Sequence, residues 1–126
     1  EAGLKLPDEV IRYGNWEYDT GYSCTKELLE NKSRPTAIFA MNDLMAAGCI
    51  HALQEAGLNV PGDIAVVGFD NREIARYLQP PLTTVALPTN EIGIRAAKHM
   101  LSRIQNPDAP PQREIVPCSI IERESV

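Results

Sequence analysis

The sequence predicts an α/β fold in which a doubly wound, mostly parallel sheet forms the middle of three layers. Two observations lead to this prediction. Short apolar runs typical of buried strands alternate with longer segments of helical periodicity, and turn-forming Gly, Pro, Asn and Asp residues separate them. The chain has 126 residues, of which 44% are hydrophobic and 23% are charged. That length and composition suit one compact domain with its own core.

Two helices are predicted in the first half of the chain, over residues 18–31 and 42–57. Asp19 or Thr20 can cap the first helix, because short polar side chains accept hydrogen bonds from the free N–H groups of a first helical turn. Asn42 can cap the second, which ends at a glycine suited to a helix C-cap. The apolar residues of the second helix recur at helical spacing: Leu44, Ala47, Ile50 and Leu53.

A third helix is predicted over residues 89–105, after a short helical turn within residues 72–81. This helix has an apolar side, which we expect to face the sheet, and a polar side, which we expect to face solvent. The apolar side holds Ile94, Ala97, Leu101 and Ile104, and the polar side holds Arg95, Lys98 and Ser102.

Four segments predict the strands of the sheet. Residues 64–69 (IAVVGF) form a continuous apolar run, which is typical of a strand buried on both faces. Residues 36–41 and 82–87 are similarly apolar or β-branched. Residues 113–126 predict one or two strands, and a proline within them favours an edge position or a crossover. A weaker strand pattern covers residues 10–15 (VIRYGN).

Three pairs of polar or aromatic residues stand where predicted strands end: Asn15–Trp16, Asn42–Asp43 and Asp70–Asn71. Right-handed crossovers place the carboxyl ends of parallel strands on one edge of a sheet, and ligands of open α/β sheets bind along that edge. We therefore expect these pairs to line one crevice. A tryptophan at such a place suits stacking on the apolar face of a sugar ring or a base.

Each pair also has a purely structural interpretation. Asp70 and Asn71 are residue types favoured in turns. Asn42 and Asp43 suit the start of a helix, as a cap and as a negative charge near the positive end of the helix dipole. The residues alone leave both interpretations open.

Other classes of function have little support. The chain has 12 basic and 17 acidic residues and a net charge of −5, which disfavours a DNA-contacting surface. No apolar run approaches the ~20 residues that cross a bilayer, so we expect no membrane contact. Three widely spaced cysteines argue against a disulfide framework, so we expect a cytoplasmic protein. No nucleophile motif, phosphate-binding glycine loop or metal-ligand spacing is present. We therefore expect no enzyme activity, no cofactor and no metal. The cysteines are expected to be reduced core residues: Cys24, Cys49 and Cys118.

Three long blocks, in order and with matching spacing, resemble the lactose-repressor (LacI/GalR) family of bacterial transcription regulators. They are PTAIFAMNDLMAAGCIHALQEAGLNVPGDIAVVGFDN, YLQPPLTTVALPTNEIGIRAA and IIERESV. The resemblance implies a periplasmic-binding-protein-like core of two α/β subdomains with an effector between them. Residues 1–126 would be the C-terminal subdomain, truncated at its start. The helix-turn-helix DNA-binding domain and the N-terminal subdomain would lie outside the chain.

By position, the resemblance assigns the effector contacts to three residues. Asp70 matches an aspartate that holds ring hydroxyls or ring nitrogens of the effector, Asn42 matches a position that hydrogen-bonds sugars, and Trp16 matches an aromatic residue that stacks on the effector. The residues implied to support these contacts are Asp43, Phe69 and Asn71. The implied ligand is a small sugar, with a purine or nucleoside as the alternative, and its binding would modulate the operator affinity of the full-length protein.

The resemblance also implies a homodimer, in which a sheet edge left open by a missing strand could exchange elements with the second copy. The residues that match the pairing region are Leu44, Ala47, Tyr77, Leu78, Pro80 and Leu82. Operator DNA would be bound only through the missing N-terminal domain. The alternative function is a periplasmic sugar-binding protein of a transport system, but the VPGDIAVVGFDN and PPLTTV blocks favour the regulator.

Overall fold

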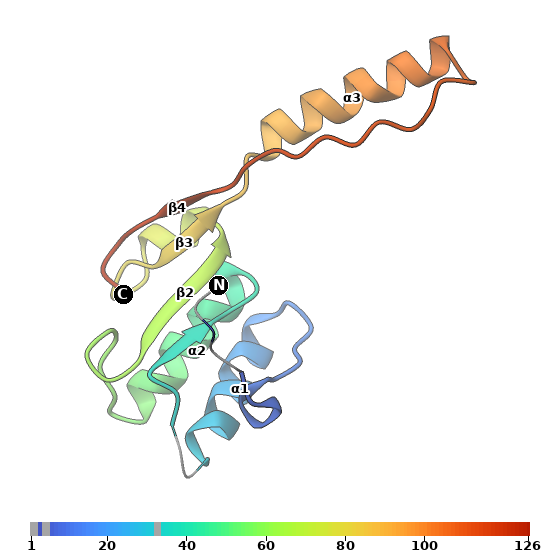
Figure 1. Ribbon diagram of the computed structural model, residues 1–126. Helices are drawn as coiled ribbons and strands as arrows, with labels where there is room; N and C mark the ends of the chain where they lie inside the picture. The colour runs from blue at the N-terminus through green and yellow to red at the C-terminus, as the bar shows by residue number, and fades with distance from the viewer. Residues whose placement is uncertain (1–2, 4–5, 32–33) are drawn as a thin grey trace.

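The computed structural model of the chain describes residues 3, 6–31 and 34–126, which form a four-stranded sheet with helices (Figure 1). The strands are β1 (Ala37–Phe39), β2 (Ala65–Asp70), β3 (Thr83–Ala86) and β4 (Ser119–Ile121), and they lie side by side in that order. The pairs β1–β2 and β2–β3 are parallel, whereas β4 runs antiparallel to β3 at the edge. The predicted mostly parallel sheet is therefore confirmed; β2 is as long as the apolar run that predicts it, whereas β1, β3 and β4 are shorter than theirs.

Two helices form one layer on one face of the sheet. Helix α2 (Asp43–Glu55) packs against β2, and helix α1 (Tyr18–Leu29) packs against α2. The two helices approach closely at Gly48, where an added Cβ would lie 2.2 Å from the backbone oxygen of Tyr18. The structure also contains two short 3-10 helices, η1 (Asp8–Val10) and η2 (Glu73–Arg76).

The hydrophobic core lies between α2 and the sheet. Alternate residues of a strand point to opposite faces, so Ile38 and Val66 reach the core, whereas Phe39 points to the other face and is 55% exposed. The buried cluster consists of Leu28, Ile38, Ala40, Ala46, Cys49, Ile50, Leu53, Ile64, Val66, Ala75 and Leu82. Below, "body" denotes residues 6–31, 34–86 and 119–126.

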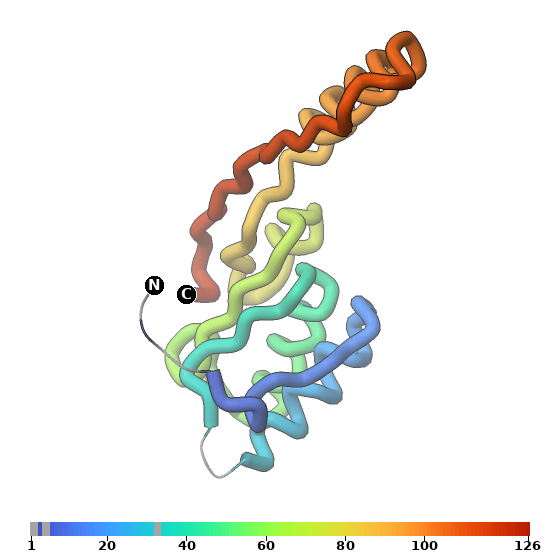
Figure 2. The backbone as a smooth tube through the Cα atoms, turned by 45° about the vertical axis from the view of Figure 1, so that its right-hand side comes forward, coloured from blue at the N-terminus to red at the C-terminus, as the bar shows by residue number. Residues whose placement is uncertain are grey.

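The third helix, α3 (Thr89–Gln105), has the predicted bounds but not the predicted packing. With the segment that returns from it, α3 forms an arm (residues 87–118) that projects away from the sheet (Figures 1 and 2). None of its residues is buried, and the side chains predicted to face the sheet are exposed: Ile94, Ala97, Leu101 and Ile104. The face of the sheet opposite α2 therefore receives no helix from the described residues.

Charged contacts hold the two halves of the arm together. Arg95 pairs with Glu91 on its own helix and with Glu114 on the returning segment. His99 also contacts Glu114, with 2.9 Å between its Nε2 and the carboxylate Oε2. The polar side of α3 therefore determines which side of the helix meets the returning segment.

Three smaller predictions are wrong. Residues 10–15 form the end of η1 and an irregular segment in place of a strand. Helix α1 begins after Glu17, which makes no side-chain cap, so neither Asp19 nor Thr20 is the N-cap. Cys118 is exposed rather than buried, while Cys49 is buried and Cys24 is half-buried; all three are free thiols.

Candidate functional site

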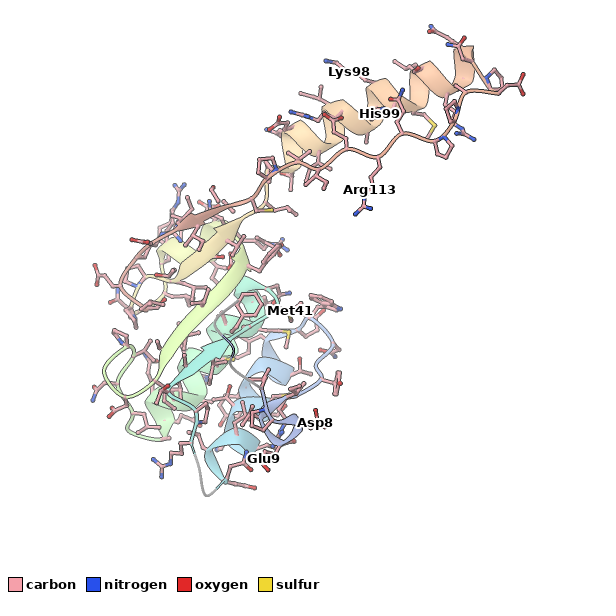
Figure 3. All side chains as sticks on the ribbon, in the orientation of Figure 1. Asp8, Glu9, Met41, Lys98, His99 and Arg113 are labelled. Atoms are coloured by element: carbon pink, nitrogen blue, oxygen red, sulfur yellow. The ribbon has the colours of Figure 1, made fainter. Side chains whose placement is uncertain are left out.

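The carboxyl ends of the parallel strands β1 and β2 lie together on one edge of the sheet. Ile38 and Phe39 of β1 are in register with Val66 and Val67 of β2. Asn42 follows β1 after two residues, and Asp70 is the last residue of β2. Figure 3 labels Met41 at this edge, on the side of the body that faces the arm; its side chain is 54% exposed.

Asn42 connects this edge to the loop before α1. Its Oδ1 accepts a hydrogen bond from Met45 N at 2.7 Å, so it is the predicted N-cap of α2. Its Nδ2 donates to the backbone oxygen of Trp16 at 2.8 Å. The side chain is 8% exposed. Because both polar ends are engaged, Asn42 has one N–H and at most one lone pair left for a ligand.

Trp16 presents its ring to solvent from a fixed loop. Its φ of +72° is a left-handed conformation that non-glycine residues rarely adopt. The neighbouring Asn15 holds the loop, since its Oδ1 accepts from Glu17 N at 3.1 Å and from the Thr20 hydroxyl at 2.9 Å. The Trp16 side chain is 58% exposed. The indole is therefore available for stacking while its backbone is held in place.

Asp70 and Asn71 form a turn in which both residues have positive φ, +103° and +53°. Such angles cost free energy and persist where the surroundings enforce them, often at functional sites. Within the described part of the chain, no hydrogen bond or ion pair engages the Asp70 carboxylate, which is half-buried. Asp70 is therefore a carboxylate at the carboxyl edge whose acceptor oxygens are not used by the described residues, and its contact with an effector stays a prediction.

Asp43, which follows β1, forms hydrogen bonds with β3 and with the residue that follows the Asp70–Asn71 turn. The carboxylate is fully buried and accepts from the Thr84 hydroxyl at 2.5 Å and from Arg72 N at 2.6 Å. Burial raises the pKa of the Asp43 carboxyl above its ordinary value of 3.8, although both hydrogen bonds oppose that rise. Sequence reasoning placed Asp43 in support of the site, and the structure places it directly under the Asp70–Asn71 turn.

Asn71 is held by a residue that sequence reasoning missed. Its Oδ1 accepts from Arg123 Nη2 at 2.8 Å, while Arg123 Nη1 donates to the backbone oxygen of Leu82 at 2.5 Å. The only signal in the sequence was a cation within the last predicted strand segment, residues 113–126, and it follows β4 after one residue. Asn71 is thus engaged within the protein. Phe69 lies half-buried one residue before the turn, on the side of β2 away from the core.

The residues predicted to pair two subunits do not all reach the surface. Tyr77 is 71% exposed, and Leu78 and Leu44 are half-buried. Leu82 is fully buried in the core, so its side chain cannot form part of an exposed surface, and Ala47 is 4% exposed. A hollow of about 300 Å³ lies between α1, α2 and η2. Its lining includes Tyr18, Ala47, Ile50, His51, Ile74 and Leu78.

This combination suits the binding of a small polar ring. A carboxylate can accept hydrogen bonds from two adjacent hydroxyls, and an indole can cover the apolar face of the same ring. No group of three or more metal-ligating side chains occurs among the residues that the structure describes. Among the same residues, no helix is long and apolar enough to cross a membrane.

Comparison with known proteins identifies the family. The model of the periplasmic binding protein-like domain family matches residues 1–126. The chain is 40% identical over its full length to the HTH-type transcriptional repressor PurR of Vibrio atlanticus, and it spans 38% of that protein's length.

Two solved structures are similar. The transcriptional regulator CelR in complex with cellobiose has a TM-score of 0.93 and 34% identity, over 99% of this chain and 38% of that one. The lac repressor dimer bound to operator and an anti-inducer has a TM-score of 0.80 and 32% identity, over 89% of this chain and 39% of that one. The resemblance stated from the sequence is therefore confirmed. The chain belongs to the periplasmic binding protein-like domain family, and its relatives are repressors of the lactose-repressor type.

Proposed function

We propose that this chain is the C-terminal effector-binding part of a LacI/GalR-type transcriptional regulator, and that it binds a small sugar. Trp16 stacks on the sugar ring, Asp70 accepts hydrogen bonds from its hydroxyls, and Asn42 contributes one remaining N–H. In the full-length protein, effector binding changes the affinity of a separate DNA-binding domain for operator DNA. The protein acts in the cytoplasm and is not an enzyme.

One observation carries the proposal. The exposed Trp16 ring and the unengaged Asp70 carboxylate come from distant parts of the sequence, yet the Asn42–Asp43 pair connects both of them at the carboxyl edge. An exposed aromatic ring and a carboxylate without a hydrogen bond among the described residues are both suited to contact with a ligand. The curated relatives are repressors, and one structural neighbour is a regulator in complex with cellobiose. These relatives favour the regulator over the alternative of a periplasmic transport protein.

Binding of the full-length protein to ribose, cellobiose and adenine, measured by titration calorimetry, tests the proposal. Asp70→Asn should weaken sugar binding by about tenfold or more, because it replaces a charged acceptor with an amide. The matched control is Asp8→Asn, an exposed carboxylate on η1 at the far end of the body (Figure 3). Operator affinity should shift with the same ligand. Failure of all three ligands to shift it, or adenine as the only ligand, would contradict the sugar proposal.

We further propose that a second copy of the chain packs on the surface around η2 and the outer side of α2. The hollow lined by Ile50, Ile74 and Leu78 can accept apolar side chains, and Tyr77 stands exposed beside it. A lac repressor dimer among the structural neighbours supports this proposal. An exchange of elements at the open edge of β1 is a second route to the same stoichiometry.

Analytical ultracentrifugation of the full-length protein distinguishes these possibilities. Tyr77→Asp should weaken the dimer by burying a charge at the interface, whereas Tyr13→Asp, at a tyrosine that is 92% exposed and does not line the hollow, should not. A monomer at high concentration would refute dimerisation. A dimer unaffected by Tyr77→Asp would favour exchange of elements.

A further inference from the structure

Asp43 is a buried carboxylate at the start of α2. The residue is 0% exposed, and no ion pair of the described residues includes it. A buried charge is costly unless hydrogen bonds compensate it. As the first residue of α2, Asp43 could serve the helix dipole equally well from an exposed position. Its burial therefore calls for an explanation beyond helix capping, which Asn42 already supplies.

The two carboxylate oxygens serve two different structural elements. Oδ2 accepts from the backbone N–H of Arg72, the residue that follows the Asp70–Asn71 turn. Oδ1 accepts from the Thr84 hydroxyl in the middle of β3. The same hydroxyl oxygen lies 3.4 Å from Asn71 N and accepts its proton. Asp43 and Thr84 together thus hold both amides that follow Asp70.

These amides belong to the strained part of the chain. Asp70 and Asn71 both have left-handed φ, and the turn would relax toward ordinary angles without a restraint. Asn71 is restrained at its side chain by Arg123, whereas Arg72 is restrained at its backbone by Asp43. The direction of the Asp70 side chain depends on these backbone angles. The hydrogen bond that fixes the Arg72 backbone therefore also limits the orientation of the Asp70 side chain.

The strand beneath the turn leaves room for this contact. Gly68 of β2 lies opposite Thr84 of β3, and a Cβ on Gly68 would be 2.4 Å from Asp43 Oδ1 and 2.8 Å from a methyl group of Leu82. Any larger residue would displace the carboxylate from beneath the turn. A carboxylate suits both of these contacts better than an amide. Two donors approach its two oxygens, whereas asparagine offers only one oxygen.

We propose that Asp43 is a positioning residue for the ligand: through Thr84 and the Arg72 amide it fixes the turn that aims the Asp70 carboxylate at the bound sugar. The part of this inference that concerns the ligand rests on the proposed function. The part that concerns the restraint of the turn is independent of that function.

Two pairs of variants separate positioning from general stability. Asp43→Asn removes one of the two acceptors, and Thr84→Val removes the hydroxyl while keeping the shape of the side chain. Thr84→Ser keeps the hydroxyl and should restore wild-type affinity. The matched control is Ser125→Ala, because Ser125 is a fully buried hydroxyl that binds Val66 O and Thr83 N near the amino ends of β2 and β3 and has no hydrogen bond with Asp43 or the turn.

Titration calorimetry of the full-length variants with ribose or cellobiose gives the affinities, and urea denaturation gives the stabilities. Asp43→Asn and Thr84→Val should each weaken binding by about tenfold, while Ser125→Ala loses stability without losing affinity. Equal affinities for Asp43→Asn and Ser125→Ala would overturn the positioning role. If Asp70→Asn also left the affinity unchanged, the proposed binding site itself would be wrong.

Hydrogen exchange tests the restraint without any ligand. The Arg72 amide should exchange faster in Asp43→Asn than in the wild type, and at the wild-type rate in Ser125→Ala after correction for global stability. Unchanged protection of Arg72 in Asp43→Asn would refute the proposal, even if none of the sugars binds the wild-type protein.

Discussion

The body and the arm each contain a helix with a clear apolar side in its sequence, but only the helix of the body packs into a hydrophobic core. Helix α2 buries eight of its residues, among them Ile50 and Leu53, against β2 and α1. Helix α3 is the longer of the two and buries none, so that Met100, Leu101 and Ile104 are 60 to 67% exposed. Periodicity therefore predicts that a helix forms and which side is apolar. It does not say which surface that side will meet.

The comparison also shows how each helix is stabilised. Helix α2 is fixed by burial and by the Asn42 cap. Helix α3 begins after Pro88 without a side-chain cap and is held by the contacts of Arg95 and His99 with Glu114. Partly exposed charge pairs contribute little free energy compared with apolar burial. The body should accordingly determine the cooperative unfolding of the chain, and the arm should contribute little.

The largest effect is expected in the middle of the body. Leu53→Ala should lower the free energy of unfolding by about 2–5 kcal/mol, because Leu53 is fully buried and its truncation leaves a cavity. Leu101→Ala removes the same atoms from the arm, where the side chain is 60% exposed, and should change stability by less than about 0.5 kcal/mol. Urea denaturation followed by circular dichroism measures both. Equal losses would show that the arm packs in solution.

Replacement of a glycine by alanine should destabilise the protein in α2 and stabilise it in α3. Gly48→Ala should cost about 1–3 kcal/mol, because the new methyl group would meet the α1 backbone at Tyr18. Gly93→Ala should stabilise α3 by about 0.5–1 kcal/mol, since nothing lies within 4 Å of an added Cβ and alanine favours helix. Thermal unfolding and the helical amide exchange rates test the pair. A destabilising Gly93→Ala would reveal a close neighbour on α3.

The cap of α2 connects stability to the candidate site. Asn42→Ala should lower the free energy of unfolding by about 0.5–2 kcal/mol through loss of the cap. It also removes the donor to Trp16 O, so the fluorescence of the single tryptophan should change. Asn42→Asp keeps the cap but loses that donor, and it should alter the fluorescence with little loss of stability. An unchanged spectrum in both variants would mean that the Trp16 loop is held by Asn15 alone.

The smallest effect is a pH dependence confined to the body. Because burial raises the Asp43 pKa above 3.8, the folded state binds this proton more tightly than the unfolded state does. The Asp43 contribution to stability therefore falls as pH rises from 3.8 through the folded-state pKa. Across that window, the stability of Asp43→Asn relative to wild type should increase with pH. A constant difference in urea titrations across the window would contradict the raised pKa.

The sequence predicted the candidate site in part. The strand-end argument applies to Asn42 and Asp70, which follow or end the parallel strands β1 and β2, because crossover geometry in parallel sheets is set by chirality and is readable from the order of elements. It does not apply to Trp16, because the predicted strand over residues 10–15 does not form, and Trp16 is connected to this edge by its hydrogen bond with Asn42. Thr84 and Arg123 could not be found in this way. Their contacts with Asp43 and Asn71 join residues 41 and 52 positions apart, and such pairings follow from strand register, which the pattern of one strand does not specify.

The sequence by itself determined most of the elements and their order. The bounds of the helix over 89–105 and the Asn42 cap of α2 are local, since they depend on hydrogen bonds within a few residues. The C-cap of α2 is Ala56, one residue before the predicted Gly57. Only the tertiary structure decided that α3 leaves the sheet, that Asn42 holds Trp16, and that Asp43 lies under the Asp70 turn. Each of these depends on which distant surfaces meet. Burial and buried polar contacts cannot be predicted from a short stretch of sequence, because they stabilise the fold only when the neighbouring elements are in place.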